Sequence, residues 1–337
     1  MTVLVTGGGG FLGKAVVKLL LEEGHVVRTF SRGDYPELVE MGVETRQGDL
    51  ADFSAVDDAV SGCDAVIHCA AKAGASLDYL SFFEANVLGT QNVLDACKRR
   101  DVSKLVYTST PSVVFAGEDQ EGIDESTPYP EKFNAHYPRT KAAAERLVLQ
   151  ANSPTLSTVA LRPHLIWGPG DTQLIPRIIE RARAGRMRLV GAGQNLIDAT
   201  YIDNAAHAHV LALQKLAPDA PCAGRPYFIT NDEPMAFADV VNGILAAAGL
   251  DPVSKSVSPR VATLAGAMLE TAYALLRKRD EPPMTRFIAR QFATAHWYNI
   301  NAAKRDLGYE VLVSMEEGMR RLADDFDGSD TVQPAAT

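Results

Sequence analysis

Short runs of β-branched and other apolar residues alternate with amphipathic segments over the first half of the chain. These runs predict strands at residues 2–6, 25–30, 43–47, 64–70, 104–110 and 158–162. Strands that alternate with helices in this way form a parallel sheet that helices cover on both faces. The pattern therefore predicts an α/β fold with a Rossmann-type, doubly wound parallel sheet.

The periodicity changes after residue 170, where the pattern becomes irregular and mostly helical. Helical spacing is seen over residues 174–186, 203–216 and 237–249. We expect a nucleotide-binding domain over 1–170, to which later segments return, followed by a smaller, mostly helical substrate lobe over 171–325. The polar end, 326–337, is expected to be disordered.

One apolar segment, Val261–Leu276, bears on membrane contact. It is shorter than a spanning helix and contains Glu270, so a buried helix or a lid is expected. The alternative is a peripheral apolar helix near a lipid-like substrate, which allows at most peripheral membrane contact. The chain opens on a strand pattern rather than on a charged leader and an apolar core, so a cytoplasmic location is expected.

Composition narrows the class of partner. The 337 residues are 46% hydrophobic and carry a formal net charge of −9, which argues against a nucleic-acid partner and favours small molecules. The cysteines form no CxxC pair, so they are expected to be reduced thiols: Cys63, Cys69, Cys97 and Cys222. His207 and His209 have no acidic or cysteine neighbours at ligand spacing, so no metal site is predicted.

The run VTGGGGFLGKAVVKLL places Gly7, Gly10 and Gly13 between a strand and a helix. Glycines at this spacing allow a tight turn, a close approach of the backbone to a pyrophosphate, and close packing of helix on strand. The start of the helix then offers free N–H groups to the phosphates. The run predicts a dinucleotide site.

The end of the second strand distinguishes the two nicotinamide cofactors. An acid that would bind a free ribose 2′-hydroxyl is absent there, and Ser31 and Arg32 take its place. A hydroxyl and a guanidinium suit a 2′-phosphate, so NADP(H) is predicted, with Arg28 as a possible helper. Asp49 and Leu50, after the third strand, are expected to contact the adenine.

Thr110, Tyr137 and Lys141 form the candidate catalytic group. Tyr and Lys four residues apart share one helix face, and Pro138 is tolerated only if Tyr137 lies at the helix start. A phenol needs a stabilised anion to transfer protons near neutral pH, and an adjacent ammonium supplies this. Thr110 would hold the substrate carbonyl.

These motifs resemble the extended short-chain dehydrogenase/reductase family, in particular its 3β-hydroxysteroid dehydrogenase branch. The resemblance runs from residue 1 to about 325 and rests on these stretches: TGGGGFLG, GDL, HCAAKAG, ANVLGTQNVLDAC, YTSTPSVVF, YPRTK, LRPHLIWGPGD, TYIDNAAHAHVLAL and AKRDLGYEVLVSMEEGMRRL. It implies that Asn86 joins the catalytic set by ordering the active-site helix. It also implies further cofactor contacts, from Phe11, Leu12, Ala70, Ala71, Tyr137, Lys141 and Pro163.

The runs GDYPELVEMGV and EPPMTRF are similar to bacterial reductases of 2-alkyl-3-oxoalkanoic acids in long-chain olefin biosynthesis. This resemblance implies NADPH-dependent reduction of a 3-keto group to the 3-hydroxy acid. Two departures from relatives are Thr110 where many have Ser, and the missing acid of the NAD-dependent steroid enzymes. A sterol dehydrogenase and a non-catalytic NADP sensor remain as alternatives. A homodimer and contacts with pathway enzymes are compatible with the resemblance.

The substrate contacts are the least determined by sequence. Three cations are candidates for binding the substrate carboxylate, namely Lys72, Arg139 and Arg177. His164 and Trp167 lie in a loop expected to border the nicotinamide, where lining the pocket and simple packing are both open.

Overall fold

The nucleotide-binding part is a seven-stranded sheet, described here from a computed structural model that covers residues 1–276, 278 and 280–330. All pairings in this sheet are parallel. Its strands are, in spatial order, β12 (Arg225–Ile229), β7 (Ser157–Pro163), β5 (Lys104–Thr108), β4 (Ala65–His68), β1 (Thr2–Thr6), β2 (Val26–Ser31) and β3 (Glu44–Gln47). The Rossmann-type topology expected from the sequence is confirmed.

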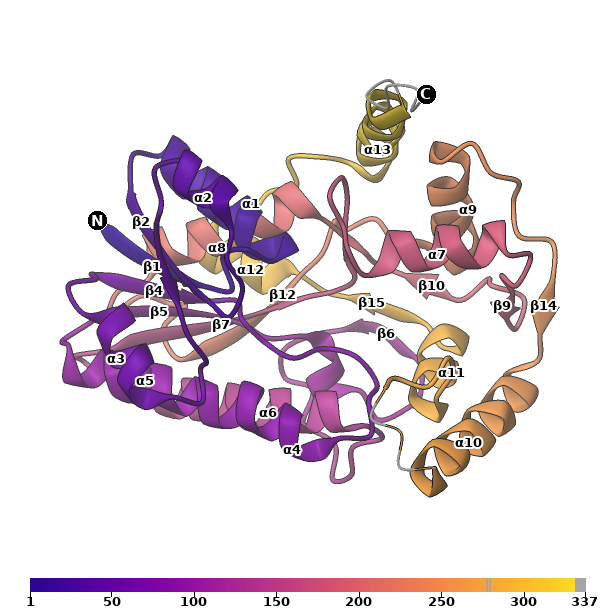
Figure 1. Cartoon of the computed structure of the whole chain (residues 1–337), viewed down its shortest axis with the longest axis horizontal. Coiled ribbons are helices and arrows are strands. Elements are labelled where there is room, and N and C mark those ends of the chain that lie inside the picture. Colours follow the sequence, from indigo (N-terminus) through magenta and orange to yellow (C-terminus); the bar gives the residue numbers. More distant parts are fainter. Residues whose placement is uncertain (277, 279, 331–337) are drawn as a thin grey trace, which may run out of the picture.

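Helices cover both faces of this sheet (Figure 1). One face carries α1 (Phe11–Glu22), α8 (Ile202–Lys215) and α12 (Asn301–Leu307), with α2 (Pro36–Glu40) near β3. The other face carries α3 (Phe53–Val60), α5 (Gly89–Arg99) and α6 (His136–Gln150). Central strands such as β1 are buried on both sides, which explains their continuous apolar runs.

Two segments that follow residue 200 return to the nucleotide-binding part. β12 adds a strand to the sheet beside β7, and α8 packs against α1 on one of its faces. The strand at 225–229 was not predicted from the sequence, and it contains Pro226. Proline is tolerated at the edge of a sheet, and β12 is the edge strand.

The second part of the molecule lies beyond the carboxyl ends of the strands (Figure 1). Its helices are α7 (Leu174–Arg183), α9 (Phe237–Ala247), α10 (Pro259–Leu275), α11 (Arg286–Ala293) and α13 (Met315–Asp330). A four-stranded mixed sheet joins them, in the order β13 (Met235–Ala236), β10 (Leu196–Ile197), β15 (His296–Tyr298) and β6 (Gln120–Ile123). Two short pairs add β11 (Thr200–Tyr201) with β8 (Ile166–Trp167), and β14 (Ser256–Val257) with β9 (Leu189–Val190).

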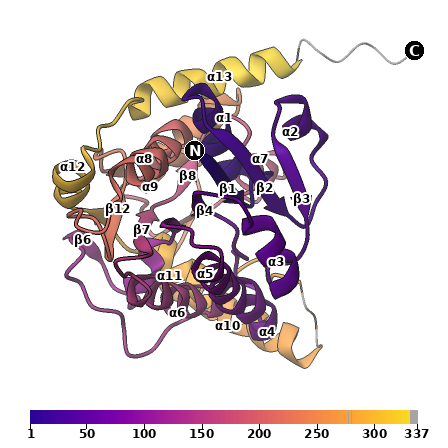
Figure 2. The same ribbon diagram turned by 90° about the vertical axis from the view of Figure 1, so that its left-hand side faces the viewer.

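The end of the described chain is helical where disorder was expected. α13 packs against α9 and continues through residue 330, and Figure 2 shows it lengthwise at the edge of the molecule. Leu322 is buried, and Phe326, four residues later, packs against the same apolar cluster. This contact holds the helix together, so the expectation of disorder is wrong for 326–330. Residues 331–337 lie outside the described chain.

α10 is exposed rather than buried. Ala262 and Gly266 face α11, while the outward side presents apolar side chains to solvent: Val261, Leu264, Met268 and Leu275. The expectation of a buried helix is therefore wrong, because Ala262 and Gly266 are the buried residues of α10, although Glu270 also binds Arg286. None of the described helices combines the length and the apolarity needed to cross a bilayer.

The four cysteines are free thiols. Cys63, Cys97 and Cys222 are buried, and Cys69 is partly exposed beside the nucleotide-binding cleft. Burial raises the pKa of the Cys69 thiol to about 11 and that of Cys97 to about 12.

Candidate active site

The turn between β1 and α1 is built for close approach of a ligand to the backbone. Gly7 has a φ of +69° and donates its N–H to the carbonyl of Phe30, 2.8 Å away. A Cβ on Gly13 would lie 2.1 Å from the Gly7 carbonyl oxygen, so only glycine lets α1 pack there. Gly10 precedes α1 without a side-chain cap, which leaves the first N–H groups of the helix available to phosphates.

Gly7 and Gly10 line a cleft of about 450 Å³ at the carboxyl edge of the sheet. Residues from several loops line it, including Ser31, Arg32, Asp49, Leu50, Ala70 and Ala71. Phe11 and Leu12 point instead into apolar clusters, so their backbone alone is placed to serve a cofactor. We call this hollow the nucleotide cleft.

Ser31 and Arg32 provide unused polar groups at one end of the nucleotide cleft. The Ser31 hydroxyl is buried and has no hydrogen-bond partner in the described part of the chain. Arg32 is exposed, and its carbonyl accepts a hydrogen bond from the side chain of Gln47. A buried hydroxyl without an acceptor or donor is costly unless a ligand meets it, so this pair fits the phosphate of a nucleotide.

Arg28 does not contribute to this end of the cleft. Its guanidinium is bound to Glu44 at 2.8 Å and to the carbonyls of Ala59 and Ser61. Residues three apart on a strand point to opposite faces, so Arg28 and Ser31 diverge. The suggestion that Arg28 assists Arg32 is wrong.

Tyr35 is a cleft residue that sequence reasoning missed. Its ring lies so close to Gly9 that a Cβ there would meet it at 2.2 Å, and it also lies beside Gly33. The ring therefore covers the glycine turn from outside. The only sequence signal was an aromatic residue three positions after Arg32, which is too common to be specific.

A second hollow, the substrate cleft, has a volume of about 340 Å³. Thr110, Ser112 and Tyr137 line it together with apolar side chains that include Leu165, Leu174, Ile178, Val190, Phe237, Met284, Phe287, Ile288 and Phe292. In the loop that follows β4, Cys69–Lys72 line the nucleotide cleft and Ala73–Ala75 line the substrate cleft. Because consecutive residues of one loop line both, the two clefts are neighbours.

Thr110 and Tyr137 meet at the wall of the substrate cleft. Thr110 precedes η2 (Pro111–Val114), a 3₁₀ turn, and its oxygen accepts the N–H of Ser112 at 3.3 Å. Tyr137 is the second residue of α6, as Pro138 requires. Burial raises the pKa of the Tyr137 phenol, and the interaction with the Thr110 hydroxyl partly lowers it.

Lys141 lies one turn further along α6 and is buried. Its ammonium donates to the Thr108 carbonyl at 2.6 Å and lies 4.1 Å from the centre of the Tyr107 ring. Burial lowers the pKa of Lys141 to about 7. The charge is therefore easily lost here, unless an anion nearby stabilises it.

Asn86 connects two parts of the site without lining either cleft. It lies in η1 (Phe83–Leu88), a π-helical turn that follows α4 (Tyr79–Phe82). Its oxygen accepts the N–H of Lys72 at 2.7 Å, and its amide donates to the Lys72 carbonyl and to the Thr140 hydroxyl. π-Turns often mark functional positions, and this one fixes the loop between the clefts to α6.

Other residues considered from the sequence lie elsewhere. Lys72 borders the nucleotide cleft and donates to Ser81, and Arg139 stacks on Tyr79, so neither lines the substrate cleft. Pro163 ends β7 and lines neither cleft.

His164 and Trp167, the two residues of this loop considered from the sequence, differ in position. His164 lines the substrate cleft and engages the Asp198 carbonyl, whereas Trp167 is buried against Tyr201. For Trp167 the packing interpretation holds and the pocket-lining interpretation is wrong. In the part of the chain that the structure describes, no group of three potential ligands forms a metal site.

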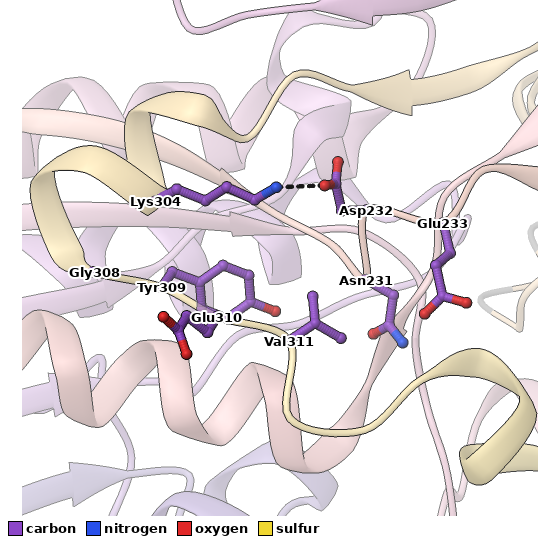
Figure 3. Close-up of a pocket in the computed structure, with 8 residues that line it drawn as sticks. All are labelled: Asn231, Asp232, Glu233, Lys304, Gly308, Tyr309, Glu310 and Val311. Carbon is purple, nitrogen blue, oxygen red and sulfur yellow. Dashed lines mark hydrogen bonds and ion pairs between the residues drawn. The ribbon is translucent and has the colours of Figure 1, made fainter.

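A third hollow lies apart from both clefts (Figure 3). Asp232 and Lys304 form an ion pair of 2.5 Å beside Asn231, Tyr309 and Val311. Both charged side chains are more than 40% exposed, and no catalytic candidate lines the hollow. It belongs to the junction that holds the last segment of the chain.

Comparisons with known proteins identify the same family that the sequence motifs resemble. A model of the 3-beta hydroxysteroid dehydrogenase/isomerase family matches residues 4–260. The 2-alkyl-3-oxoalkanoate reductase of Stenotrophomonas maltophilia (strain K279a) is 56% identical over 324 residues, covering 96% of this chain and 98% of the relative. The enzyme of that description from Shewanella oneidensis is 52% identical over 326 residues, covering 94% and 84%. The human sterol-4-alpha-carboxylate 3-dehydrogenase, decarboxylating, is 35% identical over 332 residues, covering 96% and 87%.

Solved structures agree on the fold. The UDP-glucose 4-epimerase of Thermus thermophilus, in complex with NAD, superimposes with a TM-score of 0.75 at 26% identity, covering 98% of this chain and 100% of that one. The UDP-glucuronic acid 4-epimerase from Bacillus cereus in complex with NAD has the same TM-score of 0.75 at 21% identity, covering 98% and 99%.

Proposed function

The chain belongs to the 3-beta hydroxysteroid dehydrogenase/isomerase family, and from that premise we propose that it is an NADPH-dependent reductase. Its substrate in this proposal is a 2-alkyl-3-oxoalkanoic acid, whose 3-keto group is reduced to the 3-hydroxy acid. Support comes from two relatives above 50% identity that carry the name 2-alkyl-3-oxoalkanoate reductase.

The observation that carries the proposal is the position of Tyr137 and Thr110 in an apolar cleft beside the nucleotide cleft. The apolar lining suits two long alkyl chains, and the two hydroxyls offer a polar contact for one carbonyl oxygen. A 2-alkyl-3-oxo acid has both features.

The residues of the site then have distinct tasks. NADPH, when bound, supplies the hydride that reduces the keto carbon. Thr110, whose hydroxyl donates to Ser112 in this structure, can instead donate to the carbonyl oxygen and orient it. Tyr137 donates its phenolic proton to that oxygen, and the Lys141 ammonium stabilises the phenolate that remains. Burial raises the pKa of Tyr137, so the phenol holds its proton at neutral pH and the phenolate depends on the Lys141 charge for its stability.

The preference for NADPH rests on the end of β2. The unpartnered Ser31 hydroxyl and the exposed Arg32 guanidinium suit a phosphate on the adenosine ribose, and an Asp or Glu that would repel it is absent there. We expect the affinity for NADPH to exceed that for NADH by at least about tenfold.

The test is oxidation of NADPH by the purified protein with a long-chain 2-alkyl-3-oxo acid, with NADH measured in parallel. Rapid turnover with NADPH alone supports the proposal. If the protein instead oxidises a 3-hydroxysterol carboxylate with NAD, the activity named for the human relative would be favoured. Tight binding of NADPH without turnover of either substrate would indicate a sensor.

Tyr137→Phe tests the assigned proton donor. We expect the variant to lose at least about 99% of turnover, because the phenylalanine ring has no proton to donate. The Kd for NADPH should change less than about threefold, which fluorescence titration measures. Thr127→Val, a substitution in a loop outside both clefts, is the control. Persistent turnover in Tyr137→Phe would show that another group is the acid.

A further inference from the structure

The charged residues around the substrate cleft are mostly arginines. Arg177 and Arg181 lie one turn apart on α7, on the face that also carries Leu174 and Ile178. Arg188 lines the cleft as well, and Glu281 is the one acid among the described lining residues. His164 is neutral, because burial lowers its pKa to about 4. The cleft thus has an excess of two positive charges in a chain of net charge −9.

These arginines differ in the hydrogen-bond acceptors that their guanidinium groups already contact. Arg188 donates to the carbonyls of Gly185 and Met187, within its own turn. Arg181 donates to the Pro283 carbonyl at 2.9 Å and has no carboxylate partner in the described part of the chain. Arg177 contacts Glu281 at 3.2 and 3.5 Å, longer than the 2.7–2.9 Å of a strong charge-assisted bond.

Glu281 also lies beside the loop that contains Gly74. Its carboxylate oxygen lies 3.0 Å from the position a Cβ would have on Gly74. Gly74 belongs to the loop that passes from the nucleotide cleft to the substrate cleft. Glu281 therefore links Arg177 of α7 to this loop at the lining of the cleft, where it already supplies a carboxylate to the arginine.

We infer that Arg177 and Arg181 bind the carboxylate of the substrate, and that this carboxylate displaces Glu281 from Arg177. The inference rests on the proposed function, because it assigns the acid group of that substrate. A guanidinium suits this task, since its fork of N–H donors matches a carboxylate. Lys72 and Arg139, the other cations considered from the sequence, lie outside the substrate cleft.

The test compares a 2-alkyl-3-oxo acid with its methyl ester, which has the same keto group without the charge. In Arg177→Met and Arg181→Met, we expect the KM for the acid to rise at least about tenfold, because a charge-assisted bond is lost. The KM for the ester and both kcat values should change less than about threefold. Arg183→Met is the matched control, since Arg183 is on α7 but exposed and outside the cleft.

Glu281→Gln should act in the opposite direction. Without the internal carboxylate, the KM for the acid should fall severalfold while that for the ester stays constant. Equal changes for acid and ester in the arginine variants would show that these side chains only shape the cleft, and would overturn the inference.

A binding measurement separates this inference from the proposed function. If the wild type reduces neither compound, the proposed function is refuted. A long-chain 2-alkyl carboxylic acid is then titrated into the NADPH-loaded protein by calorimetry. Weaker binding to Arg177→Met than to Arg183→Met supports the carboxylate site, and equal binding overturns it.

Discussion

Lys141 is a buried cation whose surroundings favour its neutral form. Burial lowers its pKa from 10.5 to about 7, and the nearby Glu145 carboxylate offsets only part of that shift. Between pH 7 and about 10.5 the unfolded chain binds this proton and the folded protein releases it. The free energy of unfolding therefore rises with pH over that window. Below pH 7 the folded protein bears the whole cost of burying the charge.

We expect Lys141→Met to be inactive but more stable than the wild type, because it removes this penalty. The gain in unfolding free energy should be larger at pH 6 than at pH 9.5, by more than about 1 kcal/mol. Urea unfolding at both pH values measures it, with the exposed Lys98→Met as control. A gain independent of pH would contradict the burial of a titrating lysine.

Arg32 permits a second test at the residue scale. Arg32→Ala should raise the Kd for NADPH by about 10- to 100-fold and leave the Kd for NADH within threefold, because only NADPH carries the 2′-phosphate. Arg46→Ala is the control, since Arg46 pairs with Glu44 and lies outside the nucleotide cleft. Equal losses for both cofactors would place Arg32 on a shared part of the nucleotide.

Among the elements, the contact of α10 with α11 depends on one small residue. A Cβ on Gly266 would lie 2.6 Å from the backbone carbon of Thr285 and 2.7 Å from the nitrogen of Arg286. Backbone atoms cannot move aside as a flexible side chain can. The close approach of the two helices therefore requires glycine.

Gly266→Ala should separate these helices and destabilise the protein by about 1–3 kcal/mol, although alanine is the better helix former. Met268→Ala, on the exposed side of the same helix, should change stability by less than about 0.5 kcal/mol. Thermal unfolding of both variants makes the comparison. A neutral Gly266→Ala would mean that α10 is not packed against α11.

The predictions from sequence succeeded where a single supersecondary unit sets the geometry. The first β–α–β unit places Gly7 and Ser31 at fixed offsets, and both line the nucleotide cleft. The prediction that Arg28 assists in binding the 2′-phosphate was wrong, because the direction of its side chain depends on strand alternation and on the carbonyl acceptors at the end of α3. The Rossmann-type fold and the oxidoreductase class are confirmed.

The substrate cleft is a different case, because remote segments assemble it. Arg181 lies on α7, Glu281 and Phe287 come about a hundred residues later, and Gly74 comes about a hundred residues earlier. No local pattern reports such a juxtaposition. Its lining could therefore be described from sequence only as apolar and helical, and the partner of Arg177 was not predictable.

At the scale of the whole molecule, two buried asparagines fasten the last segment to the body. Asn204 accepts the N–H groups of Leu312 and Val313 and donates to the Val313 carbonyl. Asn231, beside the third hollow in Figure 3, donates to that same carbonyl. These bonds connect α8 and the end of β12 to the start of α13, far from each other in sequence.

Asn204→Ala should cost about 2–4 kcal/mol of stability, since it leaves the N–H groups of Leu312 and Val313 without their acceptor. It should also make α13 susceptible to limited proteolysis. Lys304→Ala, which removes the exposed ion pair with Asp232, should cost less than about 1 kcal/mol. If both variants were equally stable, the asparagine bonds would not hold the segment.

The four free cysteines have a practical consequence for all of these measurements. Alkylating reagents react with thiolates, and burial raises the pKa of Cys63, Cys69, Cys97 and Cys222. The native protein should therefore resist iodoacetamide at neutral pH, and the buried thiols of Cys63, Cys97 and Cys222 should each react once their own region opens. The cysteines lie in different segments of the nucleotide-binding part. Mass spectrometry of the alkylated peptides would then report, site by site, the order in which that part unfolds.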